Sequence, residues 1–347
     1  MTVYELASTA DDALLRSLLR ENAMPSWVTM TMEREPSYFA GLNHFGRDWA
    51  VIAREGSIPV GMYACSEQSV FLNGNAQVLG YLGALRVAPD FRNRLRVVRD
   101  GYKSIREFCR SNAPAHWFTT IAADNQPARR LLEANLKGMP RYRFVNELVT
   151  LALPTSRGHR RALWRLAKPE EMAGVCSFYN EHARRFNFSP QLTPASAQRT
   201  KAPFFVVEDR GQLVACMALW NQQAFKQVVA RGYRQPLRAL LPFYNAYAHL
   251  TNKVELPRIG QGLDQTCLAF LAVAPLRETG AMELLEDALA LCKTPVMTFG
   301  LHGKHLWLTP LRKRFTPLSY RAYVYTVSFD AAPALDDKAA QPEVALL

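Results

Sequence analysis

The residues with the clearest chemistry are four arginines, Arg92, Arg94, Arg96 and Arg99, within a run of nine residues that begins at Phe91. Guanidinium groups bind phosphate and carboxylate well, because their planar N–H donors match two oxygens at once. The run follows a turn at residues 88–90 and opens a segment with helical spacing of apolar residues. Because a helix N-terminus also offers free N–H groups and a positive dipole end, we expect an anion-binding site here.

A strand–helix–strand unit must position these arginines. Residues 78–87 and 117–122 are rich in Val, Leu, Ile and aromatic residues, which predicts two strands. The arginine-rich segment between them predicts a helix to about Ser111, and residues 124–128 open another helix. A strand–helix–strand crossover makes its two strands parallel neighbours.

This order of elements resembles the acyl-CoA-binding core of the GNAT acyltransferase superfamily. The sequence from Val87 to Arg92 is similar to the approach to the family's phosphate loop, and the helix start at Asn125 resembles its Asn-x-x-Ala-x-x-Leu pattern. The chain departs from the family at Leu95 and Val97, where glycines are usual, and at Leu132, where a tyrosine often protonates the departing thiolate. Glycine permits close approach to the backbone, so these side chains must point away from a bound donor.

The resemblance implies an acyl-CoA co-substrate and a set of donor-binding positions. A backbone N–H near the end of the central strand would hold the acyl carbonyl, and the loop would cradle the pyrophosphate. These positions are Leu85, Arg86, Val87, Arg92, Asn93, Arg94, Leu95, Arg96, Val97 and Asn125.

Direct attack by an amine also needs a proton acceptor and a proton donor. Glu67, on the strand before the central one, is the candidate base, although it equally fits an exposed strand glutamate. Tyr81 and Tyr142 are the candidate acids that would replace the missing tyrosine, and buried packing tyrosines remain the alternative.

The pattern of elements restarts after a basic, turn-forming linker at residues 154–161, which predicts two mixed αβ domains, each with a central sheet flanked by helices. We place GNAT-like domains at 1–155 and 160–330 and a flexible tail at 331–347. The second domain is partly degenerate: its loop keeps Arg277, Gly280 and Met282 but has no counterpart of residues 124–128. We therefore expect the donor in the first domain.

Two further segments carry specific expectations. Residues 32–42 are expected to form a short helix before a hairpin at residues 49–72. The second half has an extra segment, 227–263, whose residues 236–250 have helical periodicity. That helix could be part of the core, a lid, a wall of an acceptor pocket or a dimer face. A homodimer is therefore one of the possible assemblies.

The composition limits the partners. A formal net charge of +12 favours acidic ligands such as CoA, whereas the chain lacks the interleaved aromatics of a nucleic-acid surface. Six cysteines without CxxC spacing, no signal-like N-terminus and no membrane-spanning run favour a cytoplasmic protein. His302 and His305 have a metal-like spacing but no nearby cysteine or carboxylate, so no metal is expected.

The sequence therefore predicts a tandem GNAT N-acyltransferase that transfers an acyl group, in the first instance acetyl from acetyl-CoA, to a small-molecule or peptide primary amine. One alternative is a longer-chain enzyme that uses acyl carrier protein. Another is an inactive pair that binds acyl-CoA or a protein, which the missing glycines and tyrosine would favour.

Overall fold

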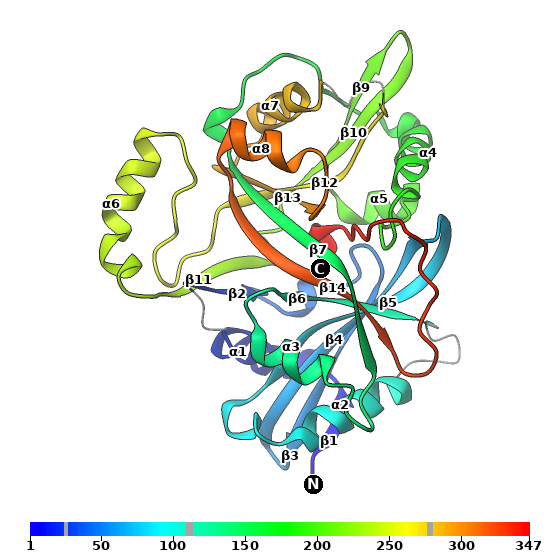
Figure 1. The fold of residues 1–347 in the computed structure, drawn as a ribbon, viewed down its shortest axis with the longest axis vertical. Helices are drawn as coiled ribbons and strands as arrows, with labels where there is room; N and C mark the ends of the chain where they lie inside the picture. Colours follow the sequence, from blue (N-terminus) through cyan, green and yellow to red (C-terminus); the bar gives the residue numbers. More distant parts are fainter. Residues whose placement is uncertain (24–26, 109–113, 115, 276–279) are drawn as a thin grey trace.

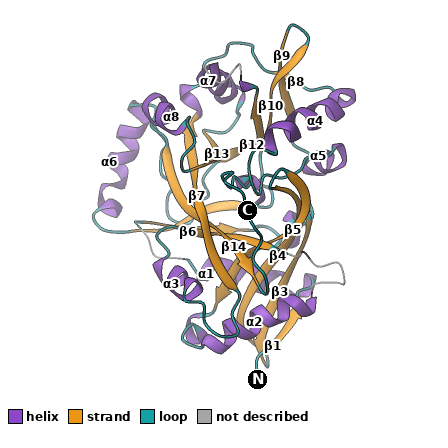
Figure 2. Ribbon diagram, turned by 45° about the vertical axis from the view of Figure 1, so that its right-hand side comes forward, coloured by secondary structure: helices purple, strands orange, loops and turns teal. Residues whose placement is uncertain are grey.

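The computed structural model describes residues 1–347 except 24–26, 109–113, 115 and 276–279, and it is a mixed αβ fold (Figure 1). Its centre is a 12-stranded sheet in the order β1-β3-β4-β5-β6-β14-β7-β13-β12-β10-β9-β8, with helices packed on its faces (Figure 2). The strands are β1 (Val3–Leu6), β2 (Val28–Glu33), β3 (Arg47–Glu55), β4 (Ile58–Leu72), β5 (Asn75–Val87), β6 (Trp117–Ala122), β7 (Arg141–Pro154), β8 (Arg165–Leu166), β9 (Phe204–Asp209), β10 (Gln212–Trp220), β11 (Gln227–Tyr233), β12 (Gln265–Val273), β13 (Val296–His302) and β14 (Leu318–Ser328). The helices are α1 (Asp12–Glu21), α2 (Leu95–Phe108), α3 (Gln126–Glu133), α4 (Met172–Ala183), α5 (Pro194–Thr200), α6 (Leu237–Leu250), α7 (Ala281–Leu291) and α8 (Leu308–Phe315).

The two ends of the sheet repeat one pattern. From one edge, β1, β3, β4 and β5 pair antiparallel, and β5 then pairs parallel with β6. From the other edge, β8, β9, β10 and β12 pair antiparallel, and β12 pairs parallel with β13. The expected parallel crossover is therefore confirmed, and it occurs once in each half.

The two halves exchange their closing strands at the middle of the sheet. β14, near the end of the chain, pairs with β6 of the first half, whereas β7 of the first half pairs with β13 of the second. The two exchanged strands also pair antiparallel with each other from residues 141 to 152, and they cross the centre of the molecule in Figure 1. The pattern of elements thus restarts after the expected boundary near residues 155–160, but a single sheet contains strands from both sides of that boundary.

A second, two-stranded sheet also joins the halves. The helix expected at residues 32–42 is wrong: residues 28–33 form β2, which pairs antiparallel with β11 of the second half. The segment Val-Thr-Met-Thr-Met-Glu alternates threonine and methionine, so strand pairing suits it better than a helix. Only a single 3-10 turn, Phe39–Gly41, lies within the expected helix.

The sheet separates two apolar clusters in the first half. Val98, Tyr102 and Ile105 of α2 pack with Leu82 on one face of the sheet. On the opposite face, leucines of α1 pack with Tyr38, Ile52 and Met62. Neighbouring residues such as Val51 and Ile52 join different clusters, as the alternation of side chains along a strand requires.

Residues 339–347 of the expected flexible tail are packed against the rest of the fold. Ala340 and Ala345 are buried, and Gln341 donates its backbone N–H to the carbonyl of Asn187. The Glu343 side chain, in the same segment, accepts hydrogen bonds from the amide of Phe270 in β12 and from the amide of Ala345. The Ala- and Pro-rich composition suggested fraying, but these small residues instead fit between strands and helices of both halves.

The helix expected at residues 236–250 is confirmed as α6, but its apolar stripe is not core. Of the residues that form the stripe, Leu240 is 52% exposed and Tyr247 is 51% exposed, whereas Ala248 is the buried residue of the helix. α6 projects from the side of the second half in Figure 1. Among the described residues, no helix is long and apolar enough to cross a membrane.

Candidate functional site

The central strands of the first half separate and open a large cavity. β5 and β6 pair only at Gly80–Trp117 and Tyr81–Phe118, after which they diverge. The Thr119 hydroxyl donates to the carbonyl of Leu82 at 2.6 Å and fixes the point of divergence. The cavity beyond it has a volume of about 1100 Å³ and is lined by both halves and by the β2–β11 sheet. It is larger than the usual pocket for a drug-sized ligand.

A bulge in β5 lies at this cavity. Between Met62 and Ala64 of β4, the opposite strand β5 advances three residues, from Arg86 to Gly83. Ala84, inside the bulge, has φ 50°, a left-handed conformation that is costly for alanine and is found at functional positions. Sequence reasoning missed Ala84, since alanine gives no signal for positive φ.

The second half has the same bulge, but there the chain itself fills the cleft. β12 advances three residues against two of β10, and Phe270 has φ 52°. The Phe270 amide donates to the carboxylate of Glu343 at 2.9 Å. A side chain at Gly300 of β13 would meet Val344 at 2.1 Å, so residues 343–347 occupy the space between the two strands.

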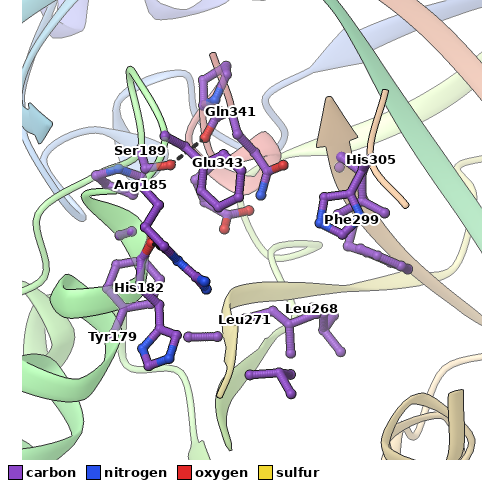
Figure 3. Close-up of a pocket in the computed structure, with 18 of the residues that line it drawn as sticks. Tyr179, His182, Arg185, Ser189, Leu268, Leu271, Phe299, His305, Gln341 and Glu343 are labelled. Carbon is purple, nitrogen blue, oxygen red and sulfur yellow. Dashed lines mark hydrogen bonds between the residues drawn. The ribbon is translucent and has the colours of Figure 1, made fainter. Parts of the chain in front are cut away.

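What remains of the second cleft is a small pocket of about 160 Å³. Figure 3 shows Arg185, His305 and Glu343 around it, with Gln341 held by a hydrogen bond from Ser189. The expected second-half loop residue Arg277 lies outside the described residues. The cavity of the first half is therefore the one with room for a donor.

The arginine-rich loop leads into α2 at the edge of the first cleft. Residues 89–91 form a 3-10 turn, and α2 begins at Leu95. Val97 packs with Phe91, Val60 and Ala53, so its side chain fills the space under the helix. The backbone amides of Arg92, Arg94 and Val97 donate to carbonyls three residues earlier, which keeps this glycine-poor loop helical.

Arg92, Arg94 and Arg96 are exposed and partly paired, whereas Arg99 is half-buried. Arg92 donates to the Asn22 side chain at 2.8 Å, and Arg94 pairs with Glu55 at 3.3 Å. Arg96, 82% exposed at its side chain, pairs with Asp100 at 3.3 Å, and Asn93 is exposed. Their remaining donors face solvent, where a polyphosphate could bind.

All of the other expected donor positions line the cavity except Leu95, which is half-buried at the start of α2. Leu85, Arg86 and Val87 lie on its wall, and so do Val97 and Asn125. Asn125 caps α3, since its side chain accepts from the amide of Ala128 at 3.3 Å. The structure thus brings the strand end, the start of α2 and the start of α3 to one cavity.

Both candidate acids line the same cavity. The Tyr81 hydroxyl lies 3.0 Å from the hydroxyl of Thr120, and the Tyr142 hydroxyl is hydrogen-bonded to that of Tyr102. Burial raises the pKa of Tyr81 and raises that of Tyr142 well above the usual range of tyrosine. Both phenols therefore stay protonated near neutral pH.

Glu67 lies elsewhere. It forms a bidentate ion pair with Arg47, with both N–O distances 2.7 Å, and it does not line the cavity. Lys226 lines the cavity instead and was missed by sequence reasoning, because one lysine before a strand carries no signal. Its ammonium donates to main-chain oxygens of Ala345 and Leu347, and burial lowers its pKa to about 8.

The two histidines with metal-like spacing belong to the second half. The rings of His302 and His305 lie 5.1 Å apart, and His305 Nδ1 accepts from the amide of Trp307 at 3.1 Å. Burial, together with the charges of His302 and Arg185, lowers the pKa of His305 to about 4. Over the described part of the chain, no group of three His, Cys, Asp or Glu could hold a metal ion.

Neither a protein-family model nor a curated protein sequence matches this chain significantly. Solved structures do resemble it. The N-myristoyltransferase of Saccharomyces cerevisiae with bound myristoyl-CoA matches with a TM-score of 0.62 and 14% identity over 98% of this chain and 84% of that one.

Two bacterial structures match with lower scores. A GCN5-related N-acetyltransferase from Anabaena variabilis matches with a TM-score of 0.52 and 11% identity, over 94% of this chain and 72% of that one. A probable N-acyltransferase from Enterococcus faecalis matches with a TM-score of 0.51 and 8% identity over the same shares. The chain therefore has a tandem GNAT-type fold, as the sequence predicted.

Proposed function

We propose that this chain is an N-acyltransferase that takes an acyl group from acyl-CoA in the first-half cleft and transfers it to an amine. The observation that carries the proposal is the bulge at Ala84 beside the open cavity. Its counterpart in the second half, Phe270, already donates its amide to a carboxylate oxygen. The Ala84–Leu85 segment would offer an amide to the acyl carbonyl in the same way and stabilise the oxyanion that forms on attack.

The reaction would be a direct displacement. The amine nitrogen forms a bond to the acyl carbon, the carbon–sulfur bond of the thioester breaks, and CoA leaves as a thiol. Tyr142 or Tyr81 would give the proton to the sulfur, because both remain protonated at neutral pH. Lys226, whose pKa burial lowers to about 8, is a group in the lining that could take the proton of the amine.

The length of the acyl chain is a second question. The resemblance suggested acetyl, whereas the cavity extends among apolar side chains of α2 such as Val98, Tyr102 and Ile105. A volume of about 1100 Å³ holds more than an acetyl group beside an acceptor. The fold neighbour from yeast was solved with myristoyl-CoA. A longer acyl chain is therefore our second candidate for the donor.

Turnover tests the function directly. We would offer acyl-CoAs from two to sixteen carbons with a broad panel of amines and follow the release of free CoA thiol. Amine-dependent release is expected, and the chain-length optimum then chooses between acetyl and longer donors. Tight acyl-CoA binding without release for any amine would support the inactive-pair alternative instead.

The arginine loop gives a prediction on donor binding. Changing Arg92 and Arg94 together to alanine should weaken CoA binding by about 10- to 100-fold, because one charge-assisted hydrogen bond is worth roughly 1.5–3 kcal/mol. Binding by the unaltered protein should also fall with salt, since exposed charges are screened over about 8–10 Å at physiological ionic strength. Calorimetry at low and high salt measures both effects.

The matched control removes the same charge elsewhere. Arg312 and Lys313 are exposed on α8 and are not among the residues that line the cavity. Their double change to alanine should leave CoA affinity within about twofold, as expected for distant surface charges. Equal losses in both double variants would show a general charge effect and would remove the loop from the donor site.

A further inference from the structure

Arg86 is a half-buried cation whose Nε is buried, and it has no acidic partner among the described residues. It lies at the end of β5, two residues after the bulge, and its side chain lines the cavity. Its Nε is buried without a hydrogen-bond partner, and its Nη1 donates to the neighbouring carbonyl of Leu85 at 3.0 Å. No ion pair among the described residues involves Arg86. A guanidinium has five N–H donors, and among the described residues the carbonyl of Leu85 is the acceptor that the Arg86 side chain contacts.

Among the described residues, the groups that act on the charge of Arg86 are tyrosine hydroxyls; Asp124 lines the same cavity but forms no ion pair with Arg86. Burial lowers the pKa of this arginine, while the phenols of Tyr320, Tyr81 and Tyr38 act in the opposite direction. The Tyr38 hydroxyl is also buried without a partner. Burying an unpaired charge is costly, and an unsatisfied buried group in a folded protein calls for a ligand or solvent that satisfies it.

The position of Arg86 separates it from the arginine loop. Arg86 stands directly opposite Met62 of β4, and cross-strand partners project from the same face of a sheet. Met62 belongs to the cluster under α1, whereas α2 packs on the opposite face. The Arg86 side chain thus projects to the α1 face, away from the face on which α2 continues the arginine loop.

Arg86 also lies close to the reacting atoms. Residues rise about 3.3 Å along a strand, so the Arg86 backbone is within about 7 Å of Ala84, where the acyl carbonyl would bind. A group bound by this guanidinium therefore belongs to a molecule that approaches the carbonyl on the α1 face. That molecule is the acceptor rather than the phosphate end of the donor.

We propose that the Arg86 guanidinium binds a carboxylate of the acceptor, which makes the acceptor an amine that bears a free carboxylate near its nucleophilic nitrogen, such as an amino acid. Guanidinium and carboxylate match in a two-point hydrogen-bonded pair. The proposal rests on the proposed N-acyltransferase function, because it names the acceptor of that reaction.

The test compares matched acceptors. We would measure kcat/KM with acyl-CoA for several amino acids, for their amides and for the amines that lack the carboxylate. The unaltered protein should prefer the acids by about 10- to 100-fold, as one charged hydrogen-bonding pair implies. Arg86→Gln should abolish this preference. Arg86→Lys keeps the charge but cannot form the two-point hydrogen-bonded pair, so it should retain part of the preference.

Arg321→Gln is the matched control. Arg321 lines the same cavity but is already paired with Glu147, so its loss should keep the discrimination between acid and amide. Equal rates for acids and amides in the unaltered protein would overturn the inference while leaving acyl transfer intact. A weaker donor affinity of Arg86→Gln with unchanged acceptor preference would instead make Arg86 a ligand of the donor.

Binding keeps the inference testable if no amine is turned over. In calorimetry with protein saturated with CoA, the amino acids should bind at least tenfold more tightly than their amides, and Arg86→Gln should remove the difference. That result without turnover would uphold the carboxylate site and refute the N-acyltransferase function. Equal binding of acid and amide, or no binding of either, would overturn the inference. Circular dichroism of each variant confirms that it is folded.

Discussion

Replacing Asp287 with alanine is expected to destabilise the folded chain by about 3–5 kcal/mol, the usual cost of removing one partner of a buried charged network. The Asp287 side chain is fully buried on α7. It forms an ion pair with Arg160, and its carboxylate accepts hydrogen bonds from the backbone amides of Arg161, Leu163 and Trp164. Alanine would leave these amides and the guanidinium without their acceptor, and chemical denaturation measures the loss.

The same network gives a pH dependence. Hydrogen bonds from Arg160 and the three amides outweigh the desolvation that opposes them and hold the pKa of Asp287 below its usual value. A carboxyl group with a lowered pKa in the folded state stabilises above its unfolded pKa of about 3.9 and loses that contribution as the pH falls. The stability difference between the unaltered protein and Asp287→Ala should therefore shrink below about pH 4. A constant difference would contradict the ion-pair account.

Glu283→Ala provides the control for Asp287. Glu283 lies in the first turn of the same helix, and among the described residues it has no ion pair. Its change to alanine should alter the free energy of unfolding by no more than about 0.5 kcal/mol, as for an ordinary surface substitution. Similar losses for both variants would mean that α7 itself, rather than the buried network, sets the effect.

Gly80→Ala should disturb the cleft at the point where its strands meet. A Cβ at Gly80 would lie 2.1 Å from the ring of Trp117, which is buried and contacts Trp49 edge-on. Because Gly80 and Trp117 form one of the two paired positions between β5 and β6, the strands must separate there. We expect a loss of about 1–3 kcal/mol in stability from overpacking and a clear loss of CoA affinity.

We would measure CoA affinity by calorimetry and stability by thermal unfolding for Gly80→Ala, with Gly174→Ala as the control variant. Gly174 lies in α4, and nothing lies within 4 Å of a Cβ built there. That variant should be neutral or stabilised by up to about 1 kcal/mol, because alanine favours helix over glycine. Gly80→Ala with unchanged donor affinity would show that the strand contact does not shape the binding cavity.

Local patterns in the sequence were sufficient for the fold class and for the elements around the cleft. Alternating apolar residues and the turn at residues 88–90 predicted β5 and the start of α2. Asn125 predicted the N-terminus of α3, which its side chain caps. Repetition of the same order in the second half predicted the tandem arrangement. These signals are local, so they need no knowledge of the partner strands.

The features that depend on distant contacts were not predictable. Residues 28–33 become a strand only because β11 of the second half pairs with them. The linker at residues 154–161 is fixed by Asp287 and by the carbonyls that accept from Arg157. Likewise, the ion pair of Glu67 with Arg47 on the neighbouring strand and the burial of Lys226 depend on contacts between residues that are distant in the sequence.

The exchange of β7 and β14 also bears on how the protein forms during synthesis. When the ribosome has made β6 and β7, the strand that belongs between them, residues 318–328, does not yet exist. At roughly 5–20 residues per second, that interval lasts on the order of ten seconds. During this time the edges of β6 and β7 lack their sheet partner, and unpaired edges attract other chains. We therefore expect the nascent first half to expose these two strand edges until residues 318–328 have been made.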